Sequence, residues 1–236
     1  MSLRRRSLAV RSAEPVGPYV LLRLAADGGP LGGPGQLFMV AAEPAAADAY
    51  LPRPLSAAWA EGDELAFLLD VRGPGLAALA RARRALVLGP FGSGFALRPG
   101  RALLVGGGIG AAILPWLRRV LGRRATTLLG FRMPEQAALA PLVDPEATVV
   151  LDPVAVTEPL ARRLPFAGTV YACGPEPMLA AVAALCAEHD VPCQLAFEAP
   201  MACGFGACHG CAVRIDGAWK RLCVEGPVLE AARVVA

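Results

Sequence analysis

Four cysteines in the C-terminal part of this chain constrain its fold and chemistry more than any other feature. They form a C-x4-C-x2-C run with a fourth member further on: Cys203, Cys208, Cys211 and Cys223. This run is the plant-type spacing of ligands for a [2Fe–2S] cluster, and the chain must coil tightly to bring such thiolates onto one small core. Three interleaved glycines permit the positive φ angles of a tight coil: Gly204, Gly206 and Gly210. The segment is therefore predicted to hold a cluster that moves one electron at a time.

Two other uses of these thiols are less well supported. Structural zinc sites usually draw on two short pairs of ligands, whereas three thiols here crowd one loop. A disulfide framework suits secreted proteins, yet seven cysteines are an odd number and no secretory segment is recognised. Cys186 and Cys193 stand singly and are predicted as small buried apolar residues. A zinc-stabilised, non-redox scaffold protein stays open as an alternative of a different class.

Composition excludes several classes of protein. The 23 basic and 20 acidic residues leave a net charge of +3, which is too small to indicate a nucleic-acid partner. The arginine run at residues 4–6 is interpreted as the solvated start of a first strand. No uncharged apolar stretch of about 18 residues appears, so no membrane span is expected. No long apolar segment follows the basic N-terminal residues, so the chain is expected to be cytoplasmic, where cysteines bind metal more often than they pair.

The first 97 residues have the pattern of a β domain. Short apolar runs, such as 19–24 and 36–40, alternate with clusters of glycine and proline. Many short strands between such breakers predict a β-barrel. Residues 42–49 fit either a loop or a short helix.

Residues 98–198 alternate predicted strands and helices. The strands are expected at 102–105, 126–129, 148–151, 168–171 and 194–197, and the helices at 111–121 and 177–189. Alternation of this kind predicts a parallel α/β sheet. Residues 199–236 then form a small cluster-binding domain.

A glycine-rich turn joins the first of these strands to its helix. Gly106, Gly108 and Ala111 match the G-x-G-x-x-G/A fingerprint, in which the backbone approaches a pyrophosphate at a helix N-terminus. The acidic residue expected about 20 positions later, which would bind the ribose of NAD, is not evident. The second strand leads instead to Arg132. The fingerprint therefore indicates a dinucleotide site that departs from the ordinary Rossmann pattern.

Two further motifs are ambiguous when they are taken singly. Residues 53–56 have the sequence Arg-Pro-Leu-Ser, in which the planar guanidinium and the hydroxyl suit a flavin diphosphate, although surface Arg-Pro pairs are common. Residues 171–178 have the sequence Tyr-Ala-Cys-Gly-Pro-Glu-Pro-Met. They place Cys173 at the carboxyl end of a parallel strand, where ligand sites of α/β sheets gather. An ordinary turn after a strand explains the same residues equally well.

Together, and in this order, these motifs resemble those of the electron-transfer subunits of type B dihydroorotate dehydrogenases, in the ferredoxin–NADP reductase superfamily. The resemblance runs over nearly the whole chain and also rests on residues 34–40, 88–95 and 220–227. It implies three domains: an FAD-binding β-barrel domain at 1–97, an NAD-binding α/β domain at 98–198, and a [2Fe–2S] domain at 199–236.

The resemblance also implies which residues bind each cofactor. The FAD site would comprise Arg53, Pro54, Leu55 and Ser56 and, by position, Leu69, Asp70, Val71, Gly75 and Leu76. Family members often carry Tyr-Arg in place of Leu69 and Asp70, so backbone contacts are expected there. The NAD site would comprise Gly106, Gly107, Gly108, Ile109 and Gly110, with the ring near Cys173, Gly174 and Pro175.

The function implied by the resemblance is electron transfer in pyrimidine (UMP) biosynthesis. A partner catalytic subunit oxidises dihydroorotate on FMN; electrons then pass singly through the cluster to FAD and leave as a hydride to NAD+, without an acid–base pair. The chain is expected to be half of an enzyme, a heterotetramer with two copies of each subunit. The loop around Phe205 and His209 is the expected contact. A reductase subunit that serves a hydrogenase or a ferredoxin stays open as the alternative.

Overall fold

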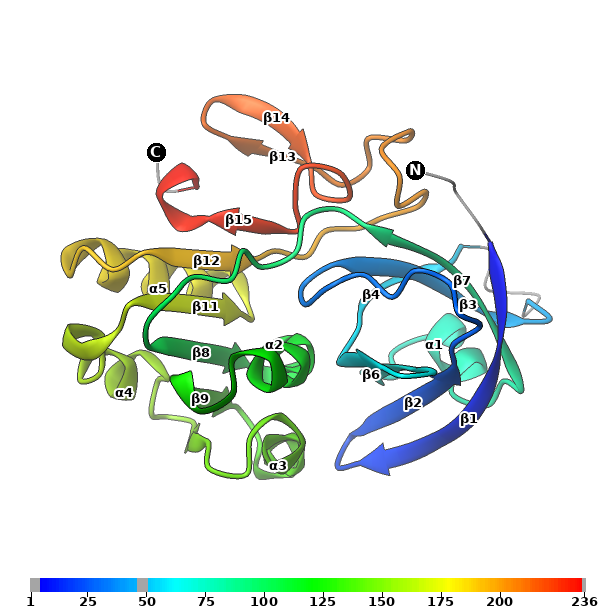
Figure 1. Cartoon of the computed structure of the whole chain (residues 1–236), viewed down its shortest axis with the longest axis horizontal. Helices are drawn as coiled ribbons and strands as arrows, with labels where there is room; N and C mark the ends of the chain where they lie inside the picture. Colours follow the sequence, from blue (N-terminus) through cyan, green and yellow to red (C-terminus); the bar gives the residue numbers. More distant parts are fainter. Residues whose placement is uncertain (1–4, 46–50, 235–236) are drawn as a thin grey trace.

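The computed structural model describes residues 5–45 and 51–234, and its first unit is a seven-stranded antiparallel sheet (Figure 1). The strand order is β4-β3-β7-β1-β2-β6-β5. The elements are β1 (Arg6–Val16), β2 (Tyr19–Ala25), β3 (Leu37–Glu43), β4 (Arg53–Ser56), β5 (Trp59–Glu61), β6 (Glu64–Leu69), α1 (Pro74–Leu79) and β7 (Arg84–Phe91). The predicted β-rich N-terminal part is confirmed. Of the ambiguous stretch 42–49, residues 42 and 43 belong to β3, and residues 46–49 lie outside the described residues.

This sheet curls until its two edges approach each other. The edge strands β4 and β5 are joined by only Ala57 and Ala58, although they occupy opposite edges of the sheet. Three Cα–Cα steps span at most about 11 Å, so the edges lie within that distance. They are not hydrogen-bonded to each other in the described part of the chain. The predicted β-barrel is thus confirmed only as a curled, open sheet, with edge strands of four and three residues.

The start of β1 corrects the interpretation of the N-terminal arginine run. Arg6 is buried, with 2% of its surface exposed, and its guanidinium donates to Asp27 at 3.1 Å and to the Pro30 carbonyl at 3.1 Å. Burial of such a cation is tolerated because it is paired. The prediction of a solvated run is therefore wrong for Arg6 and right for Arg5, which is exposed. Arg4, the third residue of the run, lies outside the described residues.

The second unit is a six-stranded sheet in the order β10-β9-β8-β11-β12-β15. Its strands are β8 (Ala102–Gly107), β9 (Ala125–Phe131), β10 (Thr148–Leu151), β11 (Thr169–Cys173), β12 (Cys193–Ala196) and β15 (Val228–Glu230). The first five are parallel, as predicted, and β15 is antiparallel to β12. The α-helices are α2 (Leu114–Leu121), α3 (Ala140–Val143), α4 (Thr157–Ala161) and α5 (Glu176–Glu188). None of the helices in the described residues is long and apolar enough to cross a membrane.

Short 3₁₀ turns complete this unit and modify one predicted helix. They are η1 (Gly108–Ile113), η2 (Gly122–Arg124), η3 (Pro134–Leu139), η4 (Leu164–Phe166) and η5 (Ala231–Arg233). The helix predicted at 111–121 therefore begins as η1 and continues as α2. Pro115 occupies the first turn of α2, where a residue without an N–H costs nothing.

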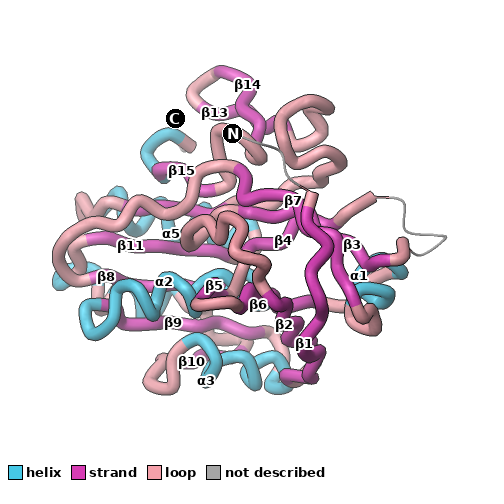
Figure 2. Tube along the Cα trace, turned by 45° about the vertical axis from the view of Figure 1, so that its right-hand side comes forward, coloured by secondary structure: helices cyan, strands magenta, loops and turns pink. Residues whose placement is uncertain are grey.

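Two hydrophobic cores place the units relative to each other. Buried residues of α2 and α3 belong to the same core as those of the curled sheet, whereas α4 and α5 cover the other face of the parallel sheet with a separate core. Figure 2 shows α2 beside β5, which it contacts. Cys186 and Cys193 lie buried in the second core, as predicted.

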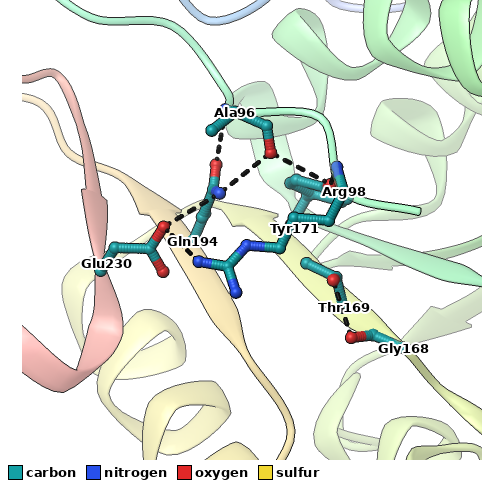
Figure 3. Close-up of polar contacts among 7 residues, drawn as sticks. All are labelled: Ala96, Arg98, Gly168, Thr169, Tyr171, Gln194 and Glu230. Atoms are coloured by element: carbon teal, nitrogen blue, oxygen red, sulfur yellow. Dashed lines mark hydrogen bonds and ion pairs between the residues drawn. The ribbon is translucent and has the colours of Figure 1, made fainter. Parts of the chain in front are cut away.

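A partly buried polar network around Gln194 ties the connection between the two sheets to β12 and β15 (Figure 3). Gln194 is 2% exposed; its Oε1 accepts from the Ala96 N–H at 2.9 Å, and its Nε2 donates to the Ala96 carbonyl at 3.0 Å and to Glu230 at 3.1 Å. Arg98 donates to the same Glu230 carboxylate at 2.8 Å. The Tyr171 hydroxyl donates to the Ala96 carbonyl at 3.3 Å. These bonds fix the curled sheet against the carboxyl-terminal strands.

The third unit contains the cysteine loop and a hairpin of β13 (Ala212–Ile215) and β14 (Ala218–Arg221). Its small core includes Leu222 and Ile215, and it also takes in Met39 and Phe91 from the curled sheet. The loop therefore packs directly on β3 and β7.

Candidate functional site

The four cysteines lie in two pairs. Cys211 and Cys223 are buried, with their Sγ atoms 3.2 Å apart. Cys203 and Cys208 are more accessible, and the Cys208 N–H approaches the Cys203 Sγ at 3.5 Å. Among the described residues, no three His, Cys, Asp or Glu side chains converge as ligands of one metal ion. Two pairs of thiols suit a two-iron core, in which four cysteines are shared between two irons, better than they suit a single ion.

Backbone N–H groups of the loop are directed at the sulfur of Cys203. Burial opposes ionisation of this thiol, but the N–H groups of Cys208 and Phe205 donate to it and lower its pKa to about 6. Burial and the adjacent Cys211 thiol instead raise the pKa of Cys223 to about 12. Hydrogen bonds to a thiolate favour its charged, metal-binding form. The donor set therefore fits an iron–sulfur cluster, whose sulfurs also accept such bonds.

Glycines allow the loop to coil, though not all at the predicted positions. Gly204 and Gly206 have φ angles of 79° and 88°, as predicted. Gly210 has no positive φ; His209 takes that conformation instead, with φ of 59°, so the prediction for Gly210 is wrong by one residue. A Cβ atom on Gly204 would lie 2.3 Å from Cγ of Met39. The loop thus rests against β3 at a distance that only glycine permits.

Arg221 holds the loop from its other side. Its Nη1 donates to the Gly206 carbonyl at 3.1 Å, and its Nη2 donates to Glu225 at 2.9 Å. Glu225 also accepts from the Arg221 N–H at 2.6 Å. A guanidinium that bonds the loop backbone places a fixed positive charge near the thiolates.

A cavity of about 470 Å³ lies between the curled sheet and the ends of β11 and β12; we call it the interlobe cavity. Five of the residues predicted for FAD line it: Pro54, Leu55, Ser56, Asp70 and Leu76. Cys173 and Ile109, which were predicted for NAD, line it as well. Burial raises the pKa of the Cys173 thiol, so this side chain stays neutral.

The other four residues predicted for FAD do not line this cavity; Arg53 and Gly75 line a small separate pocket beside α1. Arg53 lies against α1, where a Cβ on Gly75 would approach its Nη2 to 2.6 Å, and its Nη1 donates to the Leu51 carbonyl at 2.9 Å. Leu69 is buried in β6 and Val71 is exposed, and neither lines the interlobe cavity. The contacts predicted for Leu69 and Val71 stay predictions.

A second cavity, of about 620 Å³, lies over the carboxyl ends of β8 to β11; we call it the strand-end cavity. It brings together six residues predicted for NAD: Gly107, Gly108, Ile109, Gly110, Gly174 and Pro175. The two motifs touch, because a Cβ on Gly110 would lie 2.6 Å from the Gly174 Cα. Gly106 does not line the cavity and instead packs beneath the turn, where a Cβ would meet Ala111 at 2.8 Å.

The two cavities meet at three shared residues: Asp70, Ile109 and Glu198. Glu198 escaped the sequence analysis, although its place soon after a parallel strand is a signal for a ligand site. Burial raises the pKa of its carboxyl group. A flavin ring and a nicotinamide ring in the two cavities would meet beside this side chain.

The beginning of the cysteine loop lines the interlobe cavity. Ala199, Pro200 and Met201 contribute to its wall, and Met201 stands two residues before Cys203. Sequence analysis missed this role, because a methionine before a ligand motif carries no signal of its own. The three sites are therefore contiguous.

Comparisons with known proteins agree with this arrangement. Residues 198–235 match the family described as the iron–sulfur cluster binding domain of dihydroorotate dehydrogenase B. The electron transfer subunit of dihydroorotate dehydrogenase B (NAD+) from Caldanaerobacter subterraneus subsp. tengcongensis is 33% identical over 219 residues, which cover 86% of this chain and 87% of that protein. The subunit of the same name from Bacillus caldolyticus is 36% identical over 231 residues and 86% of both chains.

Solved structures share the fold. An NADH-dependent reduced ferredoxin–NADP oxidoreductase gives a TM-score of 0.83 at 21% identity and covers 99% of this chain and 90% of its own. The ferredoxin reductase of carbazole 1,9a-dioxygenase gives 0.58 at 22% identity, over 81% of this chain and 63% of its own. The architecture is that of the ferredoxin reductases, with a curled antiparallel sheet, a parallel sheet and an iron–sulfur domain.

Proposed function

Because the chain belongs to the family of electron transfer subunits of dihydroorotate dehydrogenase B (NAD+), we propose that it carries electrons from a dihydroorotate-oxidising catalytic subunit to NAD+ in pyrimidine biosynthesis. Its domains for FAD, NAD and the [2Fe–2S] cluster are residues 1–97, 98–198 and 199–236. The alternatives, a subunit for a hydrogenase or ferredoxin and a zinc-stabilised scaffold, are not favoured.

The side chains present fit the three cofactors. Cys203, Cys208, Cys211 and Cys223 would hold the cluster, and the interlobe cavity with Arg53 would hold FAD. The glycine turn and Gly174 would hold NAD. When bound, these groups supply one-electron transfer, conversion between single electrons and a hydride, and hydride exchange. The protein supplies their spacing and orientation.

The single observation that carries the proposal is the continuity of the three sites. Met201 lines the interlobe cavity two residues before Cys203, and Glu198 lines both cavities. Cys173 and Ala196 beside them are buried. A chain built only to bind a nucleotide needs no such junction with four thiols.

The partner contact is proposed on the accessible side of the cluster unit. Phe205 and Val224 expose 45% and 40% of their surface, and Trp219 at the hairpin exposes 73%. Apolar and aromatic side chains exposed together on one unit are typical of interaction surfaces. We propose an FMN-containing catalytic subunit as the partner, in a complex with two copies of each chain.

Reconstitution of the pair tests the proposal. The isolated, cofactor-loaded chain should reduce artificial dyes with NADH and should not oxidise dihydroorotate. Addition of the FMN-containing subunit should give dihydroorotate-dependent NAD+ reduction and a joint peak in gel filtration. Dihydroorotate oxidation by the isolated chain, or no complex at micromolar concentrations, would contradict it. A Trp219→Ala variant should weaken complex formation while leaving dye reduction by NADH unchanged.

A further inference from the structure

The far end of the strand-end cavity holds an ion pair that no motif predicted. Arg132 follows β9 and Asp152 follows β10, and both line the cavity. The Arg132 Nε lies 3.8 Å from the Asp152 Oδ2. The two strands are parallel neighbours with Phe131 opposite Leu151. The two charged residues therefore emerge side by side, although 20 positions separate them in the sequence.

The position of this pair matches the adenosine end of a bound dinucleotide. The strand order β10-β9-β8-β11 places β10 three spacings from β11, or roughly 14 Å at about 4.8 Å per spacing. The glycine turn after β8 lies between them, where a pyrophosphate is bound in sheets of this kind. With the nicotinamide at Gly174 beside β11, the adenosine ribose reaches the ends of β9 and β10.

We propose that the Arg132–Asp152 pair makes this site select NAD over NADP, with Asp152 as the residue that determines specificity. This inference rests on the proposed function. In ordinary Rossmann sites the acid that accepts a bond from the ribose 2′-hydroxyl ends the second strand, and an arginine near that place accommodates a 2′-phosphate. Here the arginine ends the second strand, β9, and the acid comes from the third strand, β10.

Asp152 acts on the dinucleotide in two ways. Its carboxylate accepts a hydrogen bond from a 2′-hydroxyl but repels a 2′-phosphate, which carries between one and two negative charges at neutral pH. It also pairs with Arg132, and so reduces the attraction of that guanidinium for a phosphate. Arg132 alone would favour NADP; the pair favours NAD.

A purely structural role does not account for this pair. Its side chains are 84% and 63% exposed, and ion pairs in that setting contribute little to stability. The loop that carries Arg132 is held by other bonds, since Gln136 accepts from the N–H groups of Arg132 and Met133 at 3.1 Å. The Asp152 N–H donates to the Phe131 carbonyl at 3.1 Å, a bond that a side-chain substitution leaves in place.

Calorimetric titration with ADP-ribose and 2′-phospho-ADP-ribose tests the inference without any redox step. Asp152→Asn keeps the size of the side chain and removes its charge. The affinity ratio of ADP-ribose to the 2′-phosphorylated ligand should fall by about ten-fold or more, as expected for loss of one charged contact. In the double variant with Arg132→Ala, most of the gain for the 2′-phosphorylated ligand should disappear. The kcat/KM ratio for NADH and NADPH in dye reduction should change in the same direction.

Glu158→Gln is the matched control. Glu158 is an exposed carboxylate that also pairs with an arginine, Arg162, but it does not line the cavity. In the Glu158→Gln variant, the affinity ratio of ADP-ribose to 2′-phospho-ADP-ribose should equal that of the unmodified protein. An unchanged ratio in Asp152→Asn, or a gain that persists in the double variant, would overturn the inference. Failure of the unmodified protein to oxidise NADH would instead count against the proposed function.

Discussion

Replacement of Gln194 by leucine should loosen the joint between the flavin and nucleotide units. The variant keeps the approximate volume of the side chain and removes three hydrogen bonds. The Ala96 N–H loses its partner; because Ala96 is exposed and water can replace part of the bond, the cost is about 1 kcal/mol. The Ala96 carbonyl still accepts from the Tyr171 hydroxyl, and Glu230 still accepts from Arg98. Loss of the two bonds that Gln194 donates to these acceptors should therefore add only about 1 kcal/mol together. The free energy of unfolding should fall by about 1–2 kcal/mol.

Urea denaturation at neutral pH measures this change, provided that fluorescence and circular dichroism give coincident transitions. Gln194→Glu should be destabilised as well, because it loses both donors and places a second carboxylate beside Glu230, and it should recover stability in acid. Gln136→Leu is the comparison; it loses two bonds to exposed backbone N–H groups, which water can replace, so its loss of stability should be smaller than that of Gln194→Leu. A loss below about 0.5 kcal/mol for Gln194→Leu would refute the role of this network.

Three further predictions concern the sites themselves. Burial raises the folded-state pKa of Glu198, so its stabilising contribution is present below the unfolded pKa and is lost as pH rises through the folded pKa; Glu198→Gln should therefore gain stability over the unmodified protein as pH rises above the unfolded pKa of about 4, and a difference that does not vary with pH would contradict the shift. Cys208→Ser should lose iron and acid-labile sulfide, which metal analysis measures, and should unsettle the cluster unit because a small core depends on its metal; zinc at stoichiometric level in the unmodified protein, without iron, would disprove the cluster. Arg53→Ala should weaken FAD binding about ten-fold to a hundred-fold in a fluorescence titration, whereas the exposed Arg81 changed to alanine should leave it unaltered; equal affinities would reject Arg53 as a diphosphate ligand.

Local patterns predicted most elements because each depends on a few consecutive residues. β10 has the predicted bounds, since the apolar run at 148–151 lies between polar and turn-forming residues. Asp152 and Glu198 were not predicted as site residues, because their roles depend on which strand ends become neighbours. Arg6 was misjudged for the same reason, as the segment that carries Asp27 and Pro30 folds over it. Sequence spacing specifies a ligand loop or a phosphate turn, whereas contacts between distant strand ends require the assembled sheet.

The return of β15 to the edge of β12 has a consequence for how the cluster can move. The chain leaves the parallel sheet after Ala196 and re-enters it at Val228, which pairs with that same residue, and the Phe197 N–H donates to the Pro227 carbonyl at 2.9 Å. The whole cluster unit is thus an insertion between two hydrogen-bonded strands, and it is held at both of its ends. Because both ends of the unit are held by the sheet, we expect the cluster to keep one distance from the interlobe cavity. Because the ends already meet, a tight turn grafted across them would remove the unit while leaving the nucleotide sheet its full set of strands.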